Sequence, residues 1–373
     1  MVTPRHAGSR PRHAGEGRYL TPHTSHPAPH TQHLLPSLAK ATDNRFICLD
    51  FTPLKMKVKI LFLLLVASTA TLNAQTHISD YRSYLATANL KGQTFILLRS
   101  FKADGKASYL AVNPQNLNTQ KIFATELRNL KPCSFSQLTL KMGNTPYIKA
   151  LLRAQANALP MQDAGITHAL PQEKGITLTI DLCPSHKGLD RDIFTSLIGA
   201  FKEAEKPIPV ALSLTGKFLK LHQGDIDWLK SLVKSGNIDI TWINHTYNHR
   251  YDPKIPISHN FLLEPGTDLQ QEVLMLESAM FEQNLMPSVF FRFPGLVSSQ
   301  QLVNKVGSFG LIPVGSDAWL AKGQQALPGS LVLIHGNGNE PLGVKDFIKL
   351  LGTEASQVRK KQWLLYDLRA AAE

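Results

Sequence analysis

Residues 238–249 read IDITWINHTYNH, an apolar run followed at once by two histidines four positions apart, His245 and His249. Runs rich in β-branched and aromatic residues favour a buried strand. Two histidines at positions i and i+4 face the same way on a helical turn and can share a divalent cation such as zinc. The stretch therefore predicts a strand that ends at a metal-binding pair.

The same alternation of apolar runs and amphipathic stretches continues on both sides. Strand-like runs lie at residues 176–180, 208–214, 238–243, 289–292, 311–314 and 331–334, and helical patterns lie at 190–204, 225–234, 268–283, 300–309 and 344–351. Buried strands that alternate with helices imply a mostly parallel sheet. Six such units favour an α/β fold, a closed or nearly closed parallel (β/α) barrel, with an open sheet as the alternative.

Polar residues follow several of these strands directly. They are Asp181, the pair His245 and His249, Arg292, Asp317 with Trp319, and His335. In a parallel β/α barrel the carboxyl ends of the strands open onto one face, where active sites lie. We therefore expect these residues to converge at one mouth.

Each residue type suits a step of metal-assisted hydrolysis. An aspartate beside a metal can deprotonate a bound water, and a histidine across the cleft can protonate a leaving group. An arginine can hold the aspartate ionised. The indole of Trp319 can stack on a sugar ring.

The ordered set resembles the polysaccharide deacetylase family, the NodB-homology domain of family 4-like carbohydrate esterases. Its five motifs have counterparts here in order: TIDLC at residues 179–183, NHTYNH at 244–249, RFPG at 292–295, the region of residues 317–319, and LIH at 333–335. The resemblance covers residues 174–351 and implies a distorted, partly open barrel of the NodB type.

By that resemblance, His245 and His249 bind a divalent metal ion, with zinc as first choice and cobalt, nickel or manganese as alternatives. Asp181 is the general base, His335 is the general acid, Arg292 orients Asp181 and Asp317 tunes His335. Pro294, Gly295 and Trp319 would border the substrate. The family hydrolyses the amide or ester bond of acetyl groups on polysaccharides such as peptidoglycan or chitin, without an organic cofactor.

The first motif departs from the family pattern. Leu182 stands where the family has a second aspartate, the usual third metal ligand, and nearby substitutes are Asp181, His186 or Cys183. A Leu182→Asp change is expected to raise metal occupancy. The departure also keeps two alternatives open, namely a carbohydrate-binding protein without catalysis and a hydrolase of another acyl or amide bond.

The remaining chain divides by composition. Residues 1–55 hold six of the 14 histidines and show no apolar period, which indicates a disordered or non-native leader, with metal binding by the histidines as the alternative. Residues 56–74 have the order of a secretory signal peptide, which predicts a secreted, periplasmic or cell-envelope protein whose true start is Met56. Next come a small α+β region at 75–150, a linker at 151–173, and a C-terminal tail or helix at 352–373.

The α+β region shows three local patterns. Residues 83–90 and 147–156 are expected to be helical, and strand-like runs at 94–99 and 108–112 flank a turn around Asp104 that predicts a hairpin.

Charge and cysteine content narrow the partners. The net charge is +12, and residues 1–59 supply +6 of it from nine basic and three acidic residues. The rest is spread along the chain without a dense basic stripe, so the sequence does not predict nucleic-acid binding. The apolar run at 60–67 is too short for a membrane span. Cys133 and Cys183 either form a disulfide or remain free thiols. We expect a polysaccharide or oligosaccharide as the partner.

Overall fold

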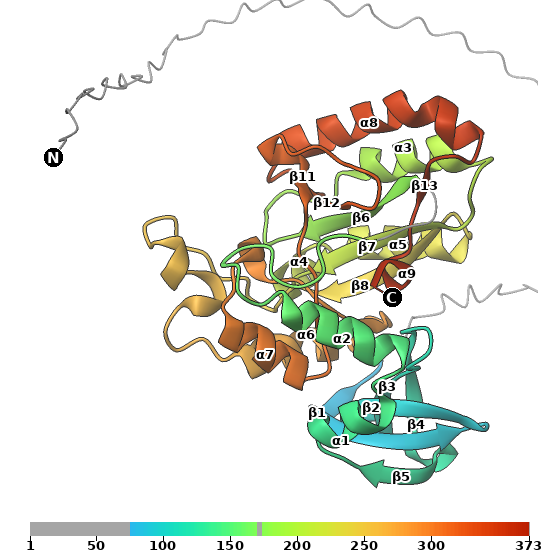
Figure 1. Cartoon of the computed structure of the whole chain (residues 1–373), viewed down its shortest axis with the longest axis vertical. Helices are drawn as coiled ribbons and strands as arrows, with labels where there is room; N and C mark the ends of the chain where they lie inside the picture. The colour runs from blue at the N-terminus through green and yellow to red at the C-terminus, as the bar shows by residue number, and fades with distance from the viewer. Residues whose placement is uncertain (1–74, 170–173, 373) are drawn as a thin grey trace, which may run out of the picture. The chain divides into compact units, whose positions relative to one another are not determined.

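The computed structural model describes residues 75–169 and 174–372, whose strands form one antiparallel and one parallel sheet (Figure 1). The antiparallel sheet has the strand order β4-β3-β2-β1-β5. Its members are β1 (Ile78–Leu90), β2 (Gln93–Ala103), β3 (Lys106–Val112), β4 (Thr119–Phe123) and β5 (Arg128–Pro132), with a short 3-10 turn, η1 (Ala124–Glu126), before β5.

Two tight turns fold β1, β2 and β3 into consecutive hairpins. Lys91 and Gly92 join β1 to β2, and Asp104 and Gly105 join β2 to β3, each residue with a positive φ. Such turns match the right-handed twist of paired strands. The hairpin predicted around Asp104 is thereby confirmed.

The helix that the sequence suggests for residues 83–90 is wrong, because these residues belong to β1. This strand pairs with β2 on one edge and with β5 on the other, and it buries Ala86 and Ala88 on one face. Backbone pairing on both edges outweighs the modest helix propensity of so short a segment.

Two helices, α1 (Phe135–Met142) and α2 (Pro146–Ala156), follow the antiparallel sheet. A helix was expected at residues 147–156, and α2 confirms it. The stretch predicted as a linker, residues 151–173, begins inside α2. Further along, Ile166 pairs with Val314, and His168 pairs with Ser330, so this stretch is attached to the larger sheet.

The second sheet is parallel throughout and has the order β10-β9-β8-β7-β6-β12-β11, with β13 paired to β6. This confirms a partly open parallel barrel, since the path of strands ends at β10 and β11. The strands are β6 (Gly175–Leu182), β7 (Ile208–Leu214), β8 (Ile238–Asn244), β9 (Pro287–Phe291), β10 (Ile312–Pro313), β11 (Ala318–Trp319), β12 (Leu331–His335) and β13 (Leu364–Leu365).

Helices connect these strands and cover the sheet. They are α3 (Arg191–Phe201), α4 (Gly216–Leu221), α5 (Gln223–Lys234), α6 (Leu269–Glu282), α7 (Gln300–Ser308), α8 (Pro341–Arg359) and α9 (Leu368–Ala372), with 3-10 turns η2 (Ile257–His259), η3 (Phe261–Leu263), η4 (Pro294–Leu296) and η5 (Leu320–Lys322). The predicted barrel limit at residue 351 falls inside α8. In the described ranges, 75–169 and 174–372, no helix combines the length and the apolarity of a membrane span.

Both faces of the parallel sheet are buried. Figure 1 shows α3 and α8 side by side near β6, and Phe194 and Phe347 from these helices pack with Leu182 in one core cluster. On the other face, Phe290 clusters with Leu151 of α2. Because each strand is covered on both faces, its sequence is a nearly continuous apolar run.

A buried ion pair ties the antiparallel sheet to α6. The guanidinium of Arg99, on β2, donates to both carboxylate oxygens of Glu277 at 2.7 and 2.9 Å, and both side chains have no exposed surface. The Tyr81 hydroxyl donates to the same carboxylate at 3.0 Å, and Arg99 also donates to the carbonyl of Phe309 at 2.6 Å. The polar atoms of the pair are thus satisfied by hydrogen bonds.

Arg99→Met should lower the free energy of unfolding by about 3–5 kcal/mol, because it leaves the charge of Glu277 buried without a partner. The double change Arg99→Met with Glu277→Met should recover a large part of that loss. Urea unfolding measures both. Lys102→Met is the matched control, since Lys102 pairs with Asp80 at the surface, and an Arg99→Met variant as stable as this control would contradict the prediction.

Candidate functional site

The predicted site residues meet at the carboxyl edge of the parallel sheet. Asp181 and His335 are direct partners in the pairing of β6 with β12. Asn244 ends β8 immediately before His245, and Arg292 follows β9 immediately. The strand ends therefore place these side chains together.

Asp181 is buried at 3% exposure and is held among positive groups. Its carboxylate lies 3.8 Å from Nε of Arg292 and 3.6 Å from Nε2 of His245. Burial raises the pKa of Asp181, but the charges of Arg292, His245 and His335 outweigh it, so the pKa falls below its usual value. Asp181 is therefore ionised at neutral pH.

Arg292 is oriented by its own hydrogen bonds. Its Nη2 donates to the hydroxyl of Thr179 at 2.9 Å and to the carbonyl of Gly315 at 3.1 Å. Within residues 75–169 and 174–372, Oδ1 of Asp181 and Nε of Arg292 have no hydrogen-bond partner although both atoms are buried. Such buried atoms need a polar partner, and a water or a substrate group at the strand ends would supply one.

The loop that carries the two histidines is not helical. Residues 245–249 fall outside helix and strand, and Thr246 and His249 have φ values of 68° and 46°. The expected helical turn is thus wrong, and left-handed backbone positions bring the rings together instead, with centroids 4.7 Å apart.

The loop is fixed to α6. Asn244 donates to the carbonyl of Val273 at 3.0 Å, and Glu272 accepts from the backbone and side-chain amides of Asn248, each at 2.7 Å. Nδ1 of His245 lies 2.9 Å from the carbonyl of Arg292. If Nδ1 donates to that carbonyl, the lone pair of Nε2 points into the site.

Three donor atoms lie where a metal ion could bind. In the described part of the chain, Cys183, His245 and His249 form a group whose ligand atoms are all within 4.8 Å of one another. Sγ of Cys183 is 3.6 Å from Nε2 of His245 and 3.5 Å from Nε2 of His249. Two imidazoles and a thiol are donors that zinc accepts in proteins, so the residues fit the metal that the sequence implies.

The environment of Cys183 favours its thiolate. Burial raises the pKa of this thiol, but the charge of His249 and hydrogen bonds from His245, His249 and His335 outweigh burial and hold the pKa well below its usual value. Cys183 and Cys133 are both free thiols in this structure, so the alternative of a disulfide between them is not realised here.

Leu182 does not face the site. It has no exposed surface and packs in the core cluster that includes Ile193 and Phe194 of α3. A carboxylate at position 182 would be buried among apolar side chains, away from the histidines. The position of Leu182 therefore argues against the expected gain of metal occupancy in Leu182→Asp, which stays a prediction.

His335 contacts Glu340 rather than Asp317. Its Nδ1 lies 2.8 Å from the Glu340 carboxylate, which also accepts from Nε1 of Trp319 at 2.7 Å. Asp317 instead lies 2.6 Å from Nδ1 of His168 and accepts from the amide of Leu331. The predicted tuning of His335 by Asp317 is corrected accordingly, because Asp317 is held by other partners.

Two opposing effects set the protonation of His335. Burial lowers its pKa, but the Cys183 sulfur, the Glu340 carboxylate and Asp181 outweigh burial and raise the pKa well above 6.5. Burial raises the pKa of Glu340, yet His335 outweighs it and the pKa falls. His335 is thus a protonated acid opposite an ionised Asp181.

A cleft of about 670 Å³ opens over these groups. Cys183, His249, His335, Glu340, Trp319 and Gly295 line it, which places Trp319 and Gly295 where the sequence predicts. Pro294 is buried, opens the turn η4 and is not among the lining residues. Its predicted contact with substrate is therefore not seen.

Sequence reasoning missed Glu340. It lies five residues beyond His335, at the N-cap of α8 and before Pro341, which occupies the first helical position. Proline at that position marks a helix start, and a carboxylate just before it, close after a reactive histidine, is the available signal.

Comparison with known proteins gives two results. Residues 79–148 match a family model described as the RP012 protein N-terminal domain. Solved structures similar to the chain include a family 4 carbohydrate esterase from Bacillus anthracis, with 19% identity, 58% of this chain and 88% of that chain covered, and a TM-score of 0.40.

Another is PdaA of Bacillus subtilis, a family 4 carbohydrate esterase, with 15% identity, coverage of 58% and 93%, and a TM-score of 0.39. A family 4 pseudoenzyme from Bacillus anthracis gives 14% identity, coverage of 57% and 69%, and a TM-score of 0.38. At such similarity we assign residue roles from the geometry of this chain alone.

Glu340→Gln should lower the pKa of His335, because it removes the negative charge that stabilises the imidazolium. The raised pKa means that the contacts of protonated His335 with Cys183 and Glu340 stabilise the fold below pH 6.5, and that this contribution is lost as pH rises through the raised value. NMR titration of the His335 ring in metal-free protein measures the shift. Asp317→Asn is the control, and an equal shift in that variant would contradict the assignment of Glu340.

Proposed function

We propose that this protein is a metal-dependent hydrolase that removes N- or O-acetyl groups from a polysaccharide. The observation that carries the proposal is the pair Asp181 and His335, an ionised carboxylate and a protonated imidazole at partnered strand positions. They flank the donors Cys183, His245 and His249. Opposite pKa shifts in neighbouring groups are the arrangement that acid–base hydrolysis requires.

The residues would divide the reaction as follows. Asp181 accepts a proton from the attacking water while the oxygen of that water bonds to the acetyl carbonyl carbon. A divalent ion held by the two histidines supplies Lewis acidity there. The backbone N–H of Gly295 donates to the oxyanion. His335 gives its proton to the departing nitrogen or oxygen as the carbon–nitrogen or carbon–oxygen bond breaks.

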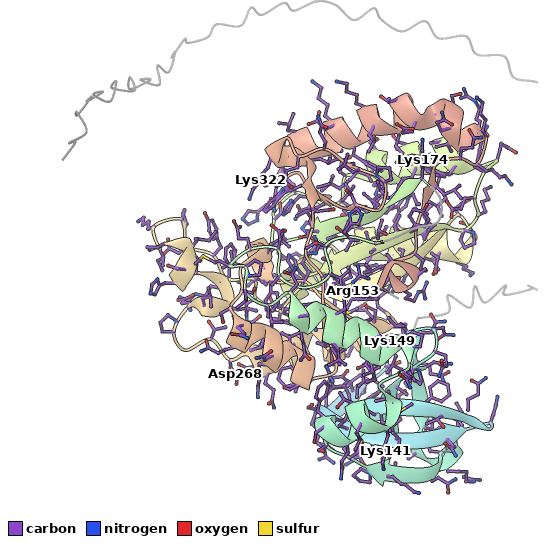
Figure 2. All side chains as sticks on the ribbon, in the orientation of Figure 1. Lys141, Lys149, Arg153, Lys174, Asp268 and Lys322 are labelled. Carbon is purple, nitrogen blue, oxygen red and sulfur yellow. The ribbon has the colours of Figure 1, made fainter. Side chains whose placement is uncertain are left out.

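Features of the cleft support a carbohydrate substrate. Tyr251, which is 58% exposed, offers an aromatic surface on which a sugar ring can stack, and the largely buried Trp319 borders the cleft. Lys217 and Lys322 bring positive charge to the cleft, and Nζ of Lys322, which Figure 2 labels, lies 3.6 Å from the centre of the Trp319 ring. These cations favour an acidic polymer such as peptidoglycan over neutral chitin.

Purified protein should release acetate from acetylated glycans, and a chelator should abolish that release. Asp181→Asn and His335→Gln should each reduce kcat/KM by about 10²–10⁴-fold, the usual contribution of a general base or acid. Acetate assays on peptidoglycan and chitooligosaccharides, at low and high salt, give the substrate preference.

His77→Ala is the control for these variants, since His77 is exposed in the N-terminal segment. Metal-loaded protein that binds glycan but releases no acetate would contradict the enzyme and indicate a carbohydrate-binding protein. Release of a different acyl group would indicate the third alternative, a hydrolase of another bond.

We also propose that the protein acts outside the cytoplasm, in the cell envelope or secreted. The support is the positive, apolar and small-residue order of residues 56–74, which lies outside the described residues. N-terminal sequencing of the mature protein should begin at Gln75. A mature protein that keeps residues 56–74 would contradict cleavage at this site.

A further inference from the structure

Sγ of Cys183 lies 3.6 and 3.5 Å from the Nε2 atoms of His245 and His249, and Cys183 and His249 line the cleft. We propose that Cys183 is the third protein ligand of the metal and binds it as a thiolate, in the place of a carboxylate. This inference rests on the metal site of the proposed function but not on the reaction or the substrate.

The distances fit coordination. With a zinc–sulfur bond of about 2.3 Å, zinc–nitrogen bonds of about 2.05 Å and tetrahedral angles, sulfur and nitrogen lie about 3.6 Å apart. The two Sγ–Nε2 distances are 3.6 and 3.5 Å. Both Sγ–Nε2 distances therefore match those around a shared tetrahedral ion.

Two ring nitrogens approach Sγ equally closely. A neutral thiol could donate to only one of them, and a thiolate could accept from both only if both Nε2 atoms carried protons. A divalent cation satisfies all three donor atoms at once. If Nδ1 of His245 donates to the carbonyl of Arg292, Nε2 presents its lone pair, which is the usual effect of such a partner on a metal-bound histidine.

The geometry of β6 selects Cys183 over its neighbours. Successive side chains along a strand point to opposite faces, so Cys183 shares the face of Asp181 while Leu182 enters the core. Asp181 contacts His245 and Arg292, and His186 is exposed. Cys183 completes the site and leaves Asp181 free to act as the base.

Cys183 has one competing role. Together with His335 and Glu340 it resembles the nucleophile, base and orienting carboxylate of a thiol hydrolase. A nucleophile requires only one imidazole, however, and two further imidazoles face this sulfur. A thiolate and a carboxylate each carry one negative charge. A metal site with Cys183 as third ligand therefore has the same net charge as a site with an aspartate in that place.

A thiolate ligand alters which metal the site prefers. Sulfur ligands favour zinc and cobalt over magnesium and manganese, which take oxygen ligands. Among the metals that the sequence leaves open, manganese becomes the least favoured.

The test uses cobalt(II)-loaded protein without substrate. A near-ultraviolet sulfur-to-cobalt charge-transfer band should appear in the wild-type protein, persist in Cys133→Ser and disappear in Cys183→Ser. Zinc affinity of Cys183→Ser should fall by more than about tenfold, since even outer partners of a ligand contribute 10–100-fold. Cys183→Asp should retain part of the zinc affinity and lack the charge-transfer band. This second variant keeps the test decisive if Cys183→Ser fails to fold.

A wild-type protein that binds cobalt without the band, or a band that survives in Cys183→Ser, would overturn the proposal. So would an acetyl adduct on Cys183, seen by mass spectrometry, together with activity that resists chelation. The spectrum is independent of turnover. A thiolate band without acetate release therefore refutes only the proposed function, and chelator-sensitive release without the band refutes only the role of Cys183.

Discussion

The alternation of side chains along β6 is the constraint on which both the core and the site depend. β6 is paired in register with β7 and β12, so it cannot slip without breaking both ladders. In this register Leu182 fills the core beside α3, while Asp181 lies beside Arg292 and His245, and Cys183 lines the cleft. A shift of one residue would exchange these faces, removing Asp181 and Cys183 from the site together and burying a charge among apolar side chains.

The buried charges of the site are stable only as a set. Alone, a buried carboxylate would take up a proton and a buried imidazole would lose one. Arg292 and His245 reverse that tendency for Asp181, and Glu340 with Cys183 reverses it for His335. Burial and charge together therefore favour an ionised Asp181 and a protonated His335 at the same pH. The same low-polarity surroundings strengthen each interaction among them.

Features governed by local pattern could be predicted from the sequence, whereas those governed by distant contacts could not. Apolar runs predicted the parallel strands, and polar residues directly after them predicted that Asp181, His245, Arg292 and His335 converge. Residues 83–90 were misassigned because pairing with β2 and β5, remote in sequence, decides their conformation. Glu340 replaced Asp317 as the partner of His335 because the start of α8 brings it there. The 245–249 loop depends on left-handed backbone angles that no periodicity reveals.

Helix α6 links the antiparallel sheet to the histidine loop. Near its start, Glu272 and Val273 hold Asn248 and Asn244. Four residues beyond Val273, and about 6 Å along the helix axis, Glu277 is held by Arg99 and Tyr81 of the sheet. Continuous backbone hydrogen bonds make a helix rigid, so fixing one turn of α6 also fixes the neighbouring turn. The small sheet, which apart from Ile78 lies within the residues that match the RP012 N-terminal domain, is thus part of the support that keeps His245 and His249 in place.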